Sequence, residues 1–101
     1  MAKYLFVYHG GKKAANEEEL AEGLDAWGRW FGSMGAAVID GGNPVGGSHT
    51  VNPDGSLTGD GGSNPASGYS LIEASGLDDA IAKAKGCPHN GTIEIAETFD
   101  M

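Results

Sequence analysis

In the first apolar segment of the chain, residues 3–9, alternate residues fall into two sets, one for each face of an extended strand, and both sets are largely hydrophobic. One face carries Leu5, Val7 and His9. The other face carries three aromatic side chains, namely Tyr4, Phe6 and Tyr8. Alternating aromatic and β-branched residues predict a β-strand. Because neither face is polar, we expect this strand to lie inside a sheet and to be covered on both sides.

A helical period replaces the period of two after Asn16. Asn16 is a good N-cap, Glu19 stands at the capping-box position three residues later, and Gly35 is suited to end the helix. Between them, apolar residues recur every three or four positions, which predicts one inward-facing stripe. The stripe consists of Leu20, Leu24, Trp27, Phe31 and Met34, with Trp30 at its edge.

The second half of the chain repeats the order of strand, helix and strand. Residues 68–74 and 92–99 predict strands, and the first of them is again largely apolar on both faces. Ser75, with Asp78 three residues later, is expected to open a helix that Gly86 and Pro88 stop. The residues expected to face inward from this helix are Leu77, Ala80, Ile81 and Ala84.

A short strand at residues 36–39 and a hairpin at residues 48–58 complete the predicted elements. The turn of the hairpin is expected at Pro53-Asp54-Gly55. The resulting order is that of a split βαβ sheet with an inserted hairpin, an α+β fold in which the first strand and the strand at 68–74 are central. Two helices cover one face of such a sheet. We therefore expect a second copy to cover the other, in a sheet-to-sheet homodimer.

The length and net charge of the chain limit the number of domains and the kinds of partner that we expect. The 101 residues fit a single domain, residues 1–101. A net charge of −8 argues against nucleic acid and against an anionic membrane surface as partners. Cys87 is the one cysteine, so no intramolecular disulfide forms. With no recognisable signal peptide and no apolar run of ~20 residues, a cytoplasmic location is expected.

Three segments of the chain resemble the YCII-related family. They are KYLFVYHGG at residues 3–11, the helix–strand segment 27–46 and the closing segment 68–99, so the resemblance covers nearly the whole chain. Its most specific parts are residues 27–42 and 68–88. The resemblance implies a ferredoxin-like fold, a dimeric α+β barrel of facing sheets, and a cleft between the sheet and the loops after the second strand. The His/Asp pair of some relatives is replaced by Leu24 and Ser33. Of an Asp-Gly-Pro-Phe motif in others, only Asp60-Gly61 is kept.

His9, Asp40 and His49 are the candidate catalytic residues. A histidine at a strand end could act as a general base, because its pKa lies near neutrality, and Asp40 could orient it. The alternative is structural: His9 closes the strand by a hydrogen bond to a loop backbone, and Asp40 caps a turn. The sequence leaves both interpretations open.

The candidate ligand-binding residues are aromatic or polar and lie near the predicted loops. They are Tyr8, Trp30, Asn43, Asp60 and Tyr69. Each also has a structural interpretation, the aromatic residues in the core and Asn43-Pro44 in a turn. His9, His49 and Asp60 have no regular metal-ligand spacing, and no phosphate-binding glycine motif occurs, so we predict no metal and no cofactor.

Three functions remain compatible with these residues. The first is the binding of a small organic molecule in a cleft at the sheet and loop face of a homodimer. The second is a lyase or isomerase that uses a histidine as general base. The third is a non-catalytic protein-interaction module, which the replaced His/Asp pair favours.

Overall fold

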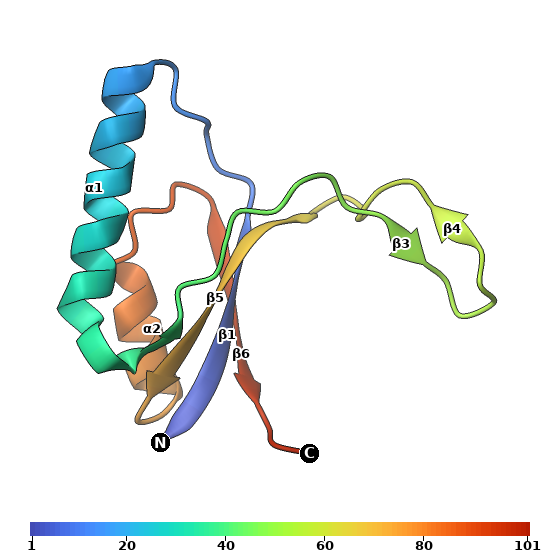
Figure 1. The fold of residues 1–101 in the computed structure, drawn as a ribbon. Coiled ribbons are helices and arrows are strands. Elements are labelled where there is room, and N and C mark those ends of the chain that lie inside the picture. The colour runs from blue at the N-terminus through green and yellow to red at the C-terminus, as the bar shows by residue number, and fades with distance from the viewer.

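The computed structural model describes residues 1–101 and shows an α+β fold with two helices, a four-stranded antiparallel sheet and a separate hairpin (Figure 1). The elements in chain order are β1 (Ala2–His9), α1 (Glu17–Met34), the 3-10 turn η1 (Gly35–Ala37), β2 (Val38–Asp40), β3 (Thr50–Val51), β4 (Leu57–Thr58), β5 (Ala66–Ala74), α2 (Leu77–Lys85) and β6 (Thr92–Thr98). Neither helix combines the length and the apolar character that crossing a bilayer requires.

The strand order of the large sheet is β2-β5-β1-β6. It places β1 and β5 in the centre and β2 and β6 at the edges, which confirms the order predicted from strands that are apolar on both faces. The register pairs Leu5 with Leu71 on β5 and with Ala96 on β6. Paired residues share a face, so the whole alternating pattern of β1 is fixed relative to its neighbours.

Both helices lie on one face of the sheet, and the core lies between them and the strands (Figure 1). The aromatic face of β1 points into this layer, and the ring centroids of Phe6 and Trp30 are 6.3 Å apart. The fully formed core is small. Its buried apolar members are Tyr4, Phe6, Tyr8, Trp30, Ile72, Ala74 and Ala80.

Helix α1 begins and ends where local sequence signals predicted. The Glu19 N–H donates to Asn16 Oδ1 at 2.9 Å, and the carboxylate of Glu19 reaches back to the N–H of Ala15. Gly35 ends the helix with φ at +56°, and its N–H donates to the Phe31 carbonyl. Glycine suits this position because left-handed backbone costs it least.

The predicted orientation of three leucines is wrong for the isolated chain. Leu20 and Leu24 were expected to face inward but are 53% and 66% exposed, and Leu77 on α2 is 54% exposed. The N-terminal half of α1 extends past the end of the sheet, so no strand lies beneath it (Figure 1). The stripe is periodic over its full length, but only its second half has a surface to pack on.

Two predicted boundaries also shift. Helix α2 is capped by Gly76, not by Ser75, and the Ser75 N–H donates to the Asp79 carboxylate at 3.0 Å. The second strand starts at Val38 and not at residue 36, because residues 35–37 continue the helix as a 3-10 turn.

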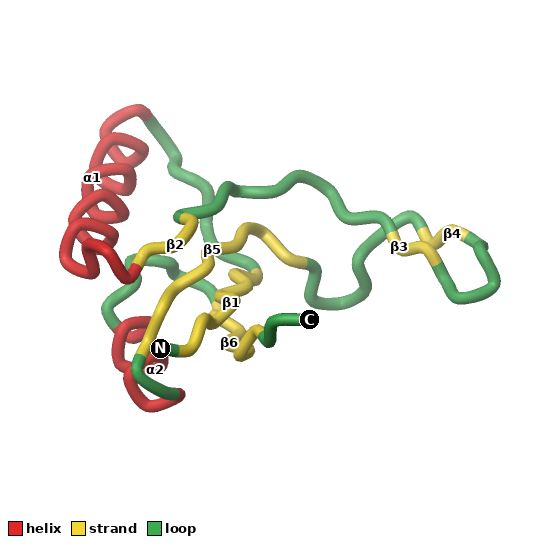
Figure 2. Tube along the Cα trace, turned by 60° about the horizontal axis from the view of Figure 1, so that its bottom comes forward, coloured by secondary structure: helices red, strands yellow, loops and turns green.

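The hairpin predicted at residues 48–58 forms, and it projects from the body as an arm, residues 46–64 (Figures 1 and 2). Its turn is held by short polar bonds: the Ser56 N–H donates to Asp54 Oδ1 at 2.9 Å, and the Gly55 N–H donates to the Asn52 carbonyl at 2.8 Å. Gly55 adopts φ +86°. The turn is therefore closed by its own residues.

Candidate functional site

His9 ends β1 on the sheet face that no helix covers. A register shift between Tyr8 and His9 marks an irregularity at this point. The ring of His9 is buried and lies between two acceptors: Nδ1 is 3.2 Å from the Pro65 carbonyl, and Nε2 is 2.9 Å from Glu94 Oε1. Pro65 lies at the root of the arm, and Glu94 lies on β6, so the ring connects the edge strand to the arm.

This geometry favours the protonated form of His9. Carbonyl and carboxylate oxygens only accept, so both ring nitrogens must donate for both bonds to form, and that is the imidazolium. The hydrogen bond to Glu94 raises the pKa of His9, and the backbone bonds at Pro65 and Asn64 act in the same direction against the opposing effect of desolvation. While both hydrogen bonds are made by the protonated ring, neither ring nitrogen is free to accept a proton.

The backbone carbonyl of His9 is held in place by the loop that follows α2. His89 Nε2 lies 3.0 Å from the His9 carbonyl, and its ring packs 5.2 Å from Tyr8 and 6.5 Å from Trp27. A Cβ at Gly91 would lie 2.1 Å from the same carbonyl oxygen, so only glycine fits there. The position of His9 is thus set by side chain and backbone together.

A buried hydrogen-bond chain runs behind the site on the helix side of the sheet. The Tyr8 hydroxyl donates to Ser70 Oγ at 2.8 Å, and that hydroxyl donates to the Gly41 carbonyl at 2.7 Å. Burial raises the pKa of Tyr8 to about 12 and that of the neighbouring Cys87 to about 11. Both groups stay neutral at physiological pH and serve packing.

Asp40 does not contact His9. Its Oδ1 accepts from the Gly42 N–H at 2.8 Å, which is the turn-capping role considered from the sequence. Gly42 has φ +73°, and a Cβ there would lie 1.7 Å from the Tyr69 carbonyl. The Asn43 carbonyl accepts from the Tyr69 N–H at 3.3 Å. Asp40 and Asn43 therefore both shape the chain where it leaves β2.

His49 and Asp60 belong to the arm and are exposed. Asp60 Oδ1 accepts from the Gly62 N–H, and the Asp60 carbonyl accepts from Thr50 Oγ1 at 2.6 Å. No group of three or more His, Cys, Asp and Glu side chains gathers anywhere in the chain in a way that could hold a metal ion. His9, His49 and Asp60 thus do not assemble.

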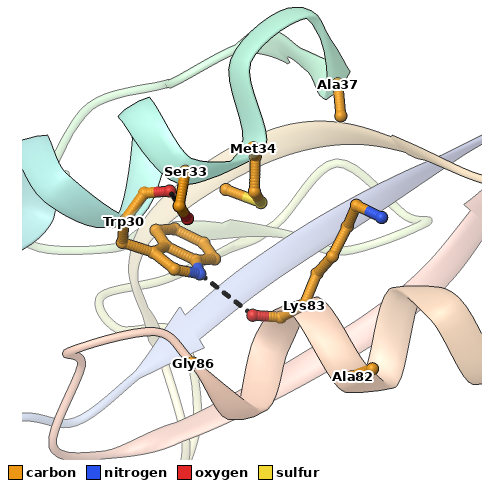
Figure 3. Close-up of a pocket in the computed structure, with 7 residues that line it drawn as sticks. All are labelled: Trp30, Ser33, Met34, Ala37, Ala82, Lys83 and Gly86. Carbon is orange, nitrogen blue, oxygen red and sulfur yellow. Dashed lines mark hydrogen bonds between the residues drawn. The ribbon is translucent and has the colours of Figure 1, made fainter.

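The predicted aromatic ligand residues separate onto the two faces of the sheet. Tyr8 and Trp30 lie on the helix side, whereas Tyr69 pairs with Val7 on the open side. Trp30 also lines a shallow groove of about 360 Å³ between α1 and α2 (Figure 3). The groove is lined by Trp30, Ser33, Met34, Ala37, Ala82, Lys83 and Gly86.

The polar groups of that groove are already engaged. Trp30 Nε1 donates to the Lys83 carbonyl at 2.9 Å (Figure 3), and Ser33 Oγ donates to the Trp30 carbonyl at 2.6 Å. The Lys83 ammonium is paired with Asp79 at 2.8 Å. With its donors and acceptors used inside the protein, the groove offers little to orient a ligand.

The open sheet face combines apolar area with one free acceptor. Leu5, Val7, Tyr69 and Leu71 form a half-exposed apolar patch across β1 and β5. Beside it, the Glu94 side chain is 65% exposed and uses Oε1 on His9, while Oε2 makes no hydrogen bond within the protein. We call this combination, Leu5, Val7, Tyr69, Leu71, His9 and Glu94, the open-face site.

Strand pairing is the sequence signal that places Glu94 beside His9. In the antiparallel register Val7 pairs with Glu94 and His9 with Thr92, so His9 and Glu94 are diagonal neighbours on one face. Pairing the first strand with the last would have brought them together. His89 carried no such signal, because a loop histidine has no periodicity to place it.

Comparisons with known proteins do not extend this description. No family model matches the chain, and no match is found among curated proteins or among solved structures. The resemblance to the YCII-related family therefore remains a hypothesis from the sequence.

Proposed function

We propose that this protein is a homodimer that binds a small organic molecule at its open-face site, within a ferredoxin-like dimeric α+β barrel of the YCII-related kind. The observation that carries the proposal is the open-face site itself, where an uncovered apolar patch adjoins a fixed histidine–glutamate pair. The two helices cover only the opposite face of the sheet (Figure 1). A second copy is the simplest cover for a face of this size and pattern.

The surface area of the single chain supports a dimer. Its accessible surface is 6838 Å². A compact monomer of 10.3 kDa exposes about 5,400 Å², so the chain exposes roughly 1,500 Å² in excess. Stable homodimer interfaces bury about 800 Å² or more on each subunit. The excess is therefore of the size that one partner subunit covers.

The residues of the open-face site indicate the chemistry of the ligand. Leu5, Val7, Tyr69 and Leu71 favour an apolar or aromatic body, and Glu94 Oε2 accepts a hydrogen bond from an N–H or O–H group. The net charge of −8 disfavours anions. The expected class is a neutral or cationic molecule with an aromatic or aliphatic body and one donor, such as a phenol or an amine.

A lyase or isomerase with His9 as general base is the second candidate, and one contact favours it. The Pro65 carbonyl holds Nδ1 as the protonated nitrogen, so Nε2 would be the basic nitrogen whenever Glu94 turns aside. In this version Pro65, and not Asp40, orients the ring. If the protein turns over a ligand and His9→Gln abolishes that turnover, the result would support this candidate over simple binding.

A thermal-shift screen with matched variants tests the proposed binding. Phenols, amines, lactones and carboxylates are screened against the unaltered protein, Glu94→Gln and the control Glu97→Gln, which pairs with Tyr4 on the other face. A ligand at 100 times its Kd adds about 2.7 kcal/mol to the native state. We expect stabilisation by phenols or amines that Glu94→Gln reduces and Glu97→Gln leaves intact. Equal shifts in both variants, or silence across the library, contradict the proposal, and silence favours the interaction module.

A further inference from the structure

The arm, residues 46–64, extends from the side of the sheet opposite the helices (Figures 1 and 2). Its two strands pair only with each other and form a sheet separate from the main one. The radius of gyration is 15.0 Å, against about 12.7 Å for a compact chain of this length. The arm thus stands beside the space in front of the open-face site.

The arm lacks a core of its own. β3 and β4 contain two residues each, and a two-stranded hairpin is marginal in water by itself. Its apolar side chains point into solvent: Val51 is 70% exposed and Leu57 is 74% exposed. Polar bonds define the turn, but they leave these two paired side chains without an apolar surface to contact.

The only charged groups of the arm besides His49 are Asp54 and Asp60, and both carboxylates accept hydrogen bonds from neighbouring backbone N–H groups. The arm therefore presents an apolar pair and satisfied turns, with no lysine or arginine to attract an acidic partner. Such a surface suits apolar contact with a chain that exposes apolar area of its own.

We propose that the arm of each copy clasps a second copy of this chain, with Val51 and Leu57 packed on the partner subunit. The inference rests on the homodimer of the proposed function and adds the part that the arm plays in it. In a two-fold dimer through the open face, arm and interface lie on the same side of each chain. Each arm then extends past the interface along the partner's body. Contact between the arm and the partner subunit explains three features together: the excess surface, the extended shape and the lack of a core in the arm.

A photo-cross-linking experiment on the full chain tests the clasp. Leu57→p-benzoylphenylalanine places the probe on the arm, and Leu77→p-benzoylphenylalanine is the control, also an exposed leucine but on the helix side. We expect irradiation of the Leu57 variant to give a covalent dimer, and mass spectrometry to map the bond to a partner peptide. The Leu77 variant should remain a single chain on a denaturing gel.

Removal of the arm gives a second, independent readout. The Val45 N–H donates to the Ser67 carbonyl at 3.0 Å, so residues 47–63 can be replaced by two glycines without stretching the chain. We expect this variant to keep the far-UV spectrum of the sheet and helices and to raise the dimer Kd about 100-fold or more.

The outcomes separate the clasp from the dimer. If the full chain is dimeric but Leu57 does not cross-link and arm removal leaves the Kd unchanged, the clasp is wrong and the proposed homodimer stands. If the full chain sediments as a monomer at 100 μM, both are wrong. A cross-linked dimer together with a weakened armless variant supports the clasp.

Discussion

His9 Nε2 and Glu94 Oε1 lie 2.9 Å apart, although 85 residues separate them in the chain. The bond joins the last residue of the central strand β1 to the edge strand β6. Because Pro65 holds the other ring nitrogen, the same histidine also fastens the root of the arm. This pair raises the pKa of His9 and places the free oxygen of Glu94 beside an apolar sheet face.

The His9–Glu94 pair predicts a specific pH dependence of stability. The pKa of His9 is raised above its ordinary value of 6.5 in the folded state, so protonated His9 stabilises the fold. That contribution is complete below pH 6.5 and is lost as the pH rises through the folded pKa. Urea unfolding between pH 5.5 and 9 should show a destabilisation by His9→Gln that is largest at the acid end and shrinks at higher pH. His49→Gln is the control, and a penalty for His9→Gln that stays constant with pH would argue against the imidazolium.

The hydrogen-bond chain from Tyr8 through Ser70 to Gly41 predicts that Tyr8→Phe destabilises the fold more than Tyr4→Phe does. Tyr8→Phe removes the donor to Ser70 inside the core and should cost about 1–2 kcal/mol of unfolding free energy. Tyr4→Phe is the matched control, because Tyr4 lies on the same strand face and its hydroxyl makes no hydrogen bond within the protein. Chemical denaturation measures both. Equal losses would mean that the buried chain contributes nothing specific.

Gly42 predicts the largest single-site effect at the arm root. With φ +73° and the Tyr69 carbonyl 1.7 Å from any added Cβ, Gly42→Ala should destabilise the fold by about 3 kcal/mol or more. Gly55→Ala in the arm turn shares a positive φ but has open space around it, and should cost only about 1 kcal/mol. Urea midpoints compare the two variants. A Gly42→Ala variant as stable as Gly55→Ala would contradict the close approach.

Cys87 should be an unreactive thiol in the native protein. Its pKa is about 11 and it is half-buried, so little thiolate exists at pH 8. Alkylation by iodoacetamide should proceed about 100-fold more slowly than in the urea-unfolded chain. Mass spectrometry follows the modification with time. Similar rates in the two states would show that the thiol is accessible and ionised.

The fold was predictable where local sequence determines local structure. Asn16 and Glu19 specify the start of α1, and Gly35 specifies its end, because each acts on backbone groups within one turn. The central position of β1 followed from its two apolar faces. The exposure of Leu20 and Leu24 was not predictable, because the length of sheet beneath a helix is a tertiary property that periodicity does not contain.

The candidate site was predictable only in part. His9 was found because a histidine that ends an apolar strand before Gly10-Gly11 stands out. Its partner was missed, because Asp40 is nearer to His9 along the chain, whereas Glu94 comes beside it only when the last strand pairs with the first. Tyr8 and Tyr69 were grouped as ligand residues, but the period of two and the pairing of Val7 with Tyr69 put them on opposite faces.

Sedimentation equilibrium from 1 to 100 μM tests most directly the claim that the open face is the interface. The unaltered chain should have twice its 10.3 kDa mass. Leu71→Asp, which places a charge in the apolar patch, should dissociate it to single chains, whereas Leu77→Asp on the helix side should not. An unaltered chain that stays at 10.3 kDa throughout, or two variants that behave alike, would contradict the account.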